Sequence, residues 1–123
     1  MSKAATSIFA FAVYLLAMGT VLVLVPNTLM QVFGLPDVQD VWVRVVGMLA
    51  VLLGGYYLAA ARSELTPFMQ WTVYARSSVI LFFAAFVLTG LAPMVLLLFG
   101  LVDLAAAIWT HLALKADARV HAS

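Results

Sequence analysis

The chain contains no cysteine among its 123 residues. Without a thiol it forms no disulfide, no thiolate metal site and no thioether link to haem. Redox chemistry that depends on a Cys-x-x-Cys pair is excluded for the same reason. The sequence therefore gives no sign of a thiol-based centre, and we expect no cofactor and no bound metal.

Charged residues are also scarce, at 9% of the chain, and the formal net charge is only +1. Nucleic-acid binding needs clustered Lys and Arg to contact phosphates, and these six basic residues form no such cluster. By contrast, 67% of the residues are hydrophobic, well above the roughly 45–50% of soluble domains. The composition excludes a nucleic-acid partner and indicates a lipid bilayer as the solvent.

Four long apolar runs fill most of the chain, and a membrane helix needs only about 20 such residues. The first run exceeds the roughly 7–15 residues of a signal-peptide core, which favours a membrane helix there. We predict one all-α domain over residues 1–123, an up-down-up-down integral membrane four-helix bundle. Its predicted parts are membrane helices at 4–25, 38–61, 67–89 and 94–116, an interfacial helix at 27–34, and a polar tail at 117–123.

Proline and short polar side chains mark the predicted helix ends. Pro26 stops the first membrane helix because proline lacks an N–H group. Asn27 is a candidate cap for the interfacial helix, and Asp37 with Asp40 suits the first turn of the second membrane helix. Thr66 is the expected cap of the third.

Small residues repeat at four-residue spacing in the second membrane helix, at Ala50 and Gly54 and again at Gly55 and Ala59. Such patterns let two helix backbones approach closely. Packing within the chain explains them as well as packing between chains does. A homo-oligomer or a larger membrane complex therefore stays open.

Arg76 and Asp103 are the charged residues expected deepest in the membrane. At about 1.5 Å per residue, Arg76 lies about 13 Å from Pro67 along its helix, and Asp103 lies about 18 Å from Lys115. The two helices are joined by a short turn, so these depths are measured from the same membrane face. An isolated charge in a membrane is costly, and we predict that Arg76 and Asp103 form an ion pair.

Other polar side chains are predicted to join this pair. Thr72 lies one turn from Arg76, and His111 continues the face of Asp103 through Ala107 and Thr110. The predicted cluster therefore comprises Arg76, Asp103, His111, Tyr56, Tyr57 and Thr72. It either fixes the register between helices or forms a polar ligand site or proton relay.

A second ion pair is predicted near the membrane surface, between Asp40 and Arg44, at the i,i+4 spacing. Arg44 is also the one basic residue on the face of the membrane opposite the termini. The other basic residues near the helix ends share the terminal face, namely Lys3, Arg62, Lys115 and Arg119. The positive-inside rule then predicts a plasma-membrane protein with both termini in the cytoplasm.

No catalytic motif is present, since the sequence contains no HExxH motif and no Ser-His-Asp arrangement within its apolar runs. We therefore predict no catalytic residues and a non-enzymatic role, either as an accessory or assembly subunit or as a binder of a lipid-like ligand. The alternative is a small oligomeric transporter or channel in which Asp103 binds a proton or cation. A lipid-modifying enzyme would need a second chain to complete its site.

Overall fold

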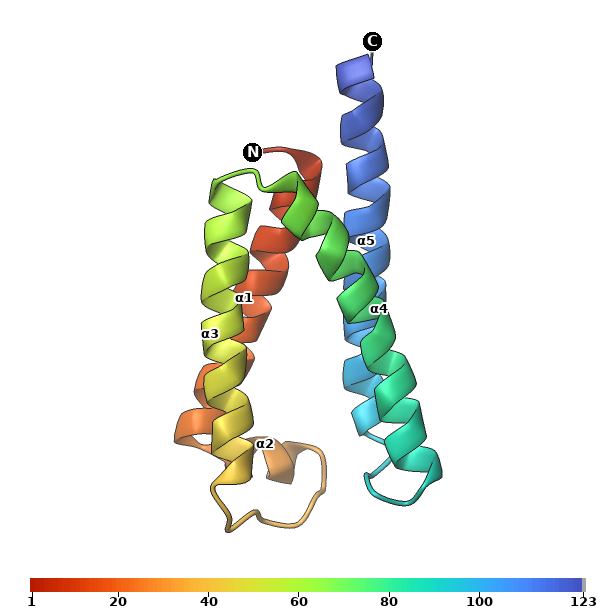
Figure 1. Cartoon of the computed structure of the whole chain (residues 1–123). Coiled ribbons are helices and arrows are strands. Elements are labelled where there is room, and N and C mark those ends of the chain that lie inside the picture. The colour runs from red at the N-terminus through yellow and green to blue at the C-terminus, as the bar shows by residue number, and fades with distance from the viewer. Residues whose placement is uncertain (123) are drawn as a thin grey trace. The chain divides into compact units, whose positions relative to one another are not determined.

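The computed structural model describes residues 1–122, with side chains described up to Val120, and its described part contains helices and no strand. Four of its helices are long and apolar enough to cross a membrane. They are α1 (Lys3–Leu24), α3 (Trp42–Arg62), α4 (Thr66–Leu88) and α5 (Leu96–Ala122). A fifth, α2 (Pro26–Val32), is short (Figure 1). The predicted all-α class with four membrane-length helices is confirmed, and the chain is a multi-pass membrane protein.

The chain divides into two compact units. The terminal unit consists of Met1–Ile8 and the chain from Ala60 onward, so it holds α4, α5 and both ends of the chain. The internal unit is Phe9–Ala59, which holds α2 and most of α1 and α3.

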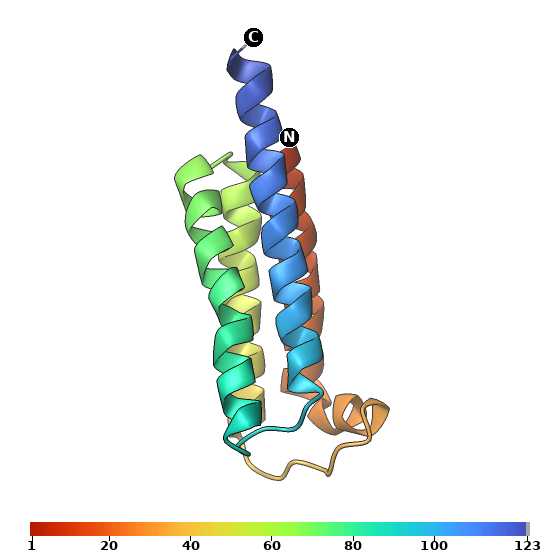
Figure 2. The ribbon, with the colours of Figure 1, turned by 90° about the vertical axis from the view of Figure 1, so that its right-hand side faces the viewer.

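In the terminal unit, α4 and α5 lie side by side in both ribbon views (Figures 1 and 2). Gly90, with a φ of 78°, lies in the turn between them. Glycine reaches this left-handed conformation without steric cost, which explains the tight turn predicted there. The side chain of Ile80 packs directly against the backbone of Gly100. A Cβ on Gly100 would lie only 2.7 Å from Ile80 Cδ1.

The start of α1 is held by carboxylates of the same unit. The Asp117 carboxylate accepts hydrogen bonds from the backbone N–H groups of Lys3 at 3.2 Å and Ala4 at 2.9 Å. Glu64 accepts from the backbone N–H and the hydroxyl of Ser2, each at 2.7 Å. These bonds satisfy N–H groups near the N-terminus of α1. The hydrogen bond from the Ser2 hydroxyl, and to a lesser extent the one from the Ser2 backbone N–H, lowers the pKa of Glu64 below its ordinary value.

The chain after residue 116 was predicted to be a polar tail, but α5 continues through it to Ala122. Asp117 contacts the first turn of α1, which gives these last turns a packing partner. Basic residues beyond the apolar run therefore remain on a regular helix.

In the internal unit, α1 and α3 approach each other at two glycines. A Cβ on Gly19 would lie 2.6 Å from the carbonyl oxygen of Gly47, and one on Gly47 would lie 2.8 Å from that of Gly19. Gly54 also packs against Leu16, whereas Gly55 has nothing within 4 Å of a built Cβ. Packing within the chain thus accounts for Gly54, and Gly55 lies on an open face.

Helix starts differ from the predicted ones where side chains bind elsewhere. The Asn27 side chain bonds both the N–H and the carbonyl of Val38, so it fastens the loop rather than capping α2. Asp40 accepts from the N–H of Trp42 at 3.3 Å, and α3 begins there. Thr66 is the first residue of α4, after an N-cap at Leu65.

Candidate functional site

Arg76 lies inside the terminal unit, with only 3% of its surface exposed. Its Nη2 donates to the hydroxyl of Thr72 at 3.1 Å and to that of Thr110 at 2.8 Å, and its Nε donates to the Thr72 carbonyl at 3.3 Å. Thr72 and Thr110 are buried as well. The guanidinium is therefore bound to two hydroxyls, one from its own helix and one from α5.

The hydrogen bonds continue from Thr110 into the first turns of α1. Thr110 and Ser7 share a hydrogen bond of 2.7 Å, and Ser7 donates to the carbonyl of Ala4 at 2.7 Å. Since the single Ser7 proton goes to Ala4, the Thr110 hydroxyl is the donor to Ser7. The network therefore runs in one direction, from Arg76 through Thr110 and Ser7 to Ala4.

Asp103 is partly exposed and lies within electrostatic range of Arg76. This proximity is what the predicted pair requires. The hydrogen bonds described for the guanidinium run to the two threonines, and a direct ion pair with Asp103 stays a prediction.

Of the other predicted members of the cluster, one lies in the Arg76 network and three lie elsewhere. Thr72 belongs to the Arg76 network, whereas His111 is exposed and lines a separate groove. Tyr57 packs its ring against Phe11 within the internal unit, with ring centres 5.5 Å apart, and Tyr56 is exposed. Their participation in the Arg76 cluster stays a prediction.

Arg44 binds the end of α1. Its Nη1 donates to the carbonyl of Val23 and, at 3.4 Å, to that of Leu24. A cation at this position satisfies the free carbonyls at a helix C-terminus and complements the helix dipole. The predicted pair with Asp40, whose carboxylate caps α3, stays a prediction.

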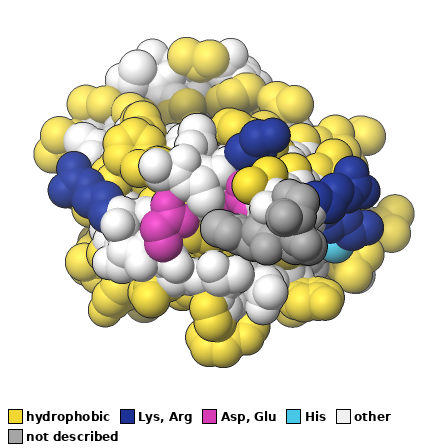
Figure 3. All heavy atoms as spheres, turned by 90° about the horizontal axis from the view of Figure 1, so that it is seen from above, with side chains coloured by type: hydrophobic (Ala, Val, Ile, Leu, Met, Phe, Trp, Pro, Cys, Tyr) yellow, Lys and Arg dark blue, Asp and Glu magenta, His cyan; other side chains and the backbone are white. Residues whose placement is uncertain are grey.

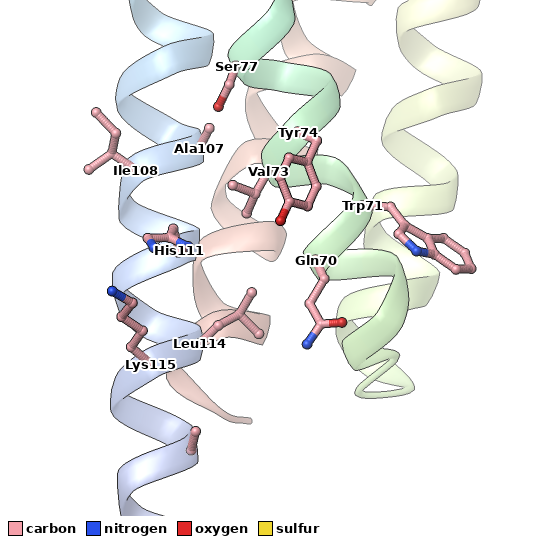
Figure 4. Close-up of a pocket in the computed structure, with 11 residues that line it drawn as sticks. Gln70, Trp71, Val73, Tyr74, Ser77, Ala107, Ile108, His111, Leu114 and Lys115 are labelled. Carbon is pink, nitrogen blue, oxygen red and sulfur yellow. The ribbon is translucent and has the colours of Figure 1, made fainter.

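A groove of about 770 Å³ lies between α4 and α5 in the terminal unit (Figure 4). Its apolar lining consists of Trp71, Val73, Ala107, Ile108, Leu114 and Ala118. The polar groups along it come from both helices, as Gln70, Tyr74 and Ser77 of α4 and His111 and Lys115 of α5.

The charged and amide side chains of this groove lie near one of its ends. Gln70 and Lys115 lie toward the end that carries the termini, while Ser77 and Ala107 lie further inside the span (Figure 4). At about 1.5 Å per residue, Gln70 and Ser77 are about 10 Å apart along α4. The groove therefore has its charged and amide groups at the outer end, beside the apolar Trp71, Leu114 and Ala118. Its inner end has Ala107, Ile108 and the hydroxyl of Ser77.

Sequence reasoning missed Ser7 and the groove. A serine in the second turn of an otherwise apolar helix was the available signal for Ser7, because such a hydroxyl needs a partner inside a membrane. Among the side chains that the structure describes, no group of three or more His, Asp or Glu residues could hold a metal ion.

Comparisons with known protein families, with curated protein sequences and with solved structures find no match to this chain. The candidate site therefore has to be interpreted from its own geometry.

Proposed function

We propose that this protein is a non-enzymatic membrane protein that binds a lipid in the groove between α4 and α5. The observation that carries the proposal is the mixed lining of the groove, in which the Lys115 ammonium and the Gln70 amide lie at the outer end and Ala107 and Ile108 lie further in. A lipid has the same polarity along its length, with a headgroup at the interface and acyl chains in the hydrocarbon. Binding in the groove would match each part of the lipid to a wall of its own kind.

The size of the groove supports a ligand of this kind. Ligand sites in proteins commonly enclose about 300–1,000 Å³, and the groove has about 770 Å³. It is open along one side, so an acyl chain could enter from the bilayer without passing through water. Tyr74, between the two ends, offers its hydroxyl to the glycerol and ester region, whose oxygens are hydrogen-bond acceptors.

The proposed orientation places the outer end of the groove at the cytoplasmic face of the plasma membrane. The positive-inside rule supports this, because Lys3, Arg62, Lys115 and Arg119 belong to the end that carries the termini. A role as an accessory or assembly subunit is compatible with lipid binding. The groove uses only residues of the terminal unit, so a lipid in it would not cover the residues of the internal unit.

Transport through Asp103 is the second candidate function. It is favoured by the partial exposure of an acid within the α5 span. The nearby Arg76 guanidinium weakens it, since a fixed cation disfavours binding of a second cation at the same carboxylate. We therefore prefer lipid binding.

Neighbouring serines provide a matched test of the groove. Ser77 lines its inner part, whereas Ser78 is absent from the lining and donates to the carbonyl of Ala75. We expect Ser77→Trp to fill the groove and to lose at least about tenfold of the lipid retained by the wild-type protein, about 1.4 kcal/mol of binding free energy. Ser78→Trp should retain lipid at the wild-type level. Native mass spectrometry of the protein released from mild detergent measures both.

Circular dichroism of both variants before the measurement shows whether each is folded. Equal lipid retention by Ser77→Trp and Ser78→Trp, in proteins of equal helix content, would contradict binding in this groove.

A further inference from the structure

We infer that the lipid bound in the α4–α5 groove is an anionic phospholipid, with its phosphate bound by Lys115 and His111. This inference rests on the proposed function and adds the chemical class of the headgroup. It is carried by the position of these two side chains on α5, one turn apart, beside the outer end of the groove.

The charges that line the groove have one sign. Lys115 is the charged residue of its described lining, and His111, Gln70 and Tyr74 contribute N–H or O–H donors around it. A phosphate oxygen accepts hydrogen bonds and bears a negative charge, so it matches an ammonium group surrounded by donors. The donors come from both helices, which allows the headgroup to be bound from both sides of the groove.

The continuation of α5 to Ala122 adds a further cation to this side. Arg119 follows Lys115 by four residues, as Lys115 follows His111, and residues at this spacing are neighbours along a helix surface. Figure 3, seen onto this end of the molecule, shows the histidine side chain next to Lys and Arg side chains. A phosphate at the outer end of the groove would therefore be attracted by the positive charge of Lys115 and, more weakly, by that of Arg119.

A second hollow of about 560 Å³ adjoins the groove and favours a different headgroup. It shares Gln70, Leu114 and Ala118 with the groove, and Glu64 and Asp117 contribute carboxylates to its lining. Both carboxylates already accept hydrogen bonds from the start of α1. Because they are engaged in that structural role, we assign the headgroup to the basic side. A preference for an amine-bearing headgroup would show that the carboxylates decide instead.

Competition among headgroups tests the inference. The protein is reconstituted in nanodiscs with equal amounts of phosphatidylglycerol, phosphatidylethanolamine and phosphatidylcholine of identical acyl chains, and the retained lipid is identified by native mass spectrometry. We expect the wild-type protein to retain phosphatidylglycerol in preference to the other two. A basic residue near the surface contributes about fivefold to the binding of an anionic lipid. Lys115→Gln should therefore lose about fivefold of the preference, and Lys115→Gln with Arg119→Gln should lose more.

Arg62→Gln is the matched control, because it removes one positive charge from the same end of the protein without altering the described lining of the groove. It should keep the wild-type preference. Loss of the preference in Arg62→Gln to the same extent as in Lys115→Gln would show a general effect of net charge and would overturn the assignment.

The outcomes separate this inference from the proposed function. Lipid retention that depends on Ser77 but prefers phosphatidylethanolamine or phosphatidylcholine would overturn the headgroup assignment alone. A phosphatidylglycerol preference that survives the double variant would overturn it as well. Absence of any retained lipid would overturn both. Free glycerol phosphate added in excess should leave the retained lipid in place, since the acyl chains supply the apolar contacts; displacement by it would indicate a site for soluble phosphates.

Discussion

Arg76→Met is expected to destabilise the terminal unit by about 3 kcal/mol, the upper end of what a hydrogen bond to a charged group contributes. The substitution removes three hydrogen bonds to Thr72 and Thr110. It also leaves Asp103 in the membrane span without its nearby cation. Unfolding in a graded mixture of mild and denaturing detergents, followed by circular dichroism, measures the change.

The interaction between Arg76 and Asp103 is isolated by a double-mutant cycle. Asp103→Asn combined with Arg76→Met should recover part of the stability lost in Arg76→Met, because the carboxylate no longer needs a counter-charge. Arg119→Met, at an exposed position, serves as the control and should change stability little. A double variant whose loss equals the sum of the two single losses would contradict an energetic coupling between Arg76 and Asp103.

Gly19→Ala is expected to disrupt the packing of α1 against α3 in the internal unit. The added methyl group would lie 2.6 Å from the carbonyl oxygen of Gly47 and 2.9 Å from the backbone nitrogen of Val51. A backbone cannot move aside as a flexible side chain can, so the helices must separate. Overpacking of this kind costs about 1–3 kcal/mol, and the same detergent unfolding assay measures it.

Gly55→Ala is the matched control for this glycine contact. Its Cβ would meet nothing within 4 Å, so the substitution should be neutral or should stabilise α3 by about 0.5–1 kcal/mol through backbone entropy. Equal stability of Gly19→Ala and Gly55→Ala would contradict the close approach of the two helices.

The four membrane helices were predictable because hydropathy and length decide them before any tertiary contact is known. The burial of Arg76 and its neighbour Thr72 was also within reach, since depth and helical spacing follow from the sequence. The hydrogen-bond partners of Arg76 could not be predicted, because the sequence does not show which hydroxyls turn toward a guanidinium. Thr110 was expected on the face of Asp103, and Ser7 supplies a link that spacing within one helix cannot reveal.

The glycine contact and the groove depend on the register between helices. The repeated small residues pointed to Gly54 and Gly55, but Gly19 and Gly47 form the tightest contact, since each meets the backbone of the other helix. The groove arises where small side chains such as Ala107 and Ser77 face each other across α4 and α5 (Figure 4). The sequence also contained no signal that Asp117 would hold α5 helical past its apolar run.

Photolabelling with a phospholipid that carries a diazirine in its acyl chain tests the central claim of a lipid site between α4 and α5 most directly. After irradiation and peptide mapping, we expect adducts to concentrate on residues 70–77 and 107–115, and to decline there in Ser77→Trp but not in Ser78→Trp. Adducts spread over the exposed apolar faces of all four membrane-length helices, with the same distribution in Ser77→Trp, would contradict the site.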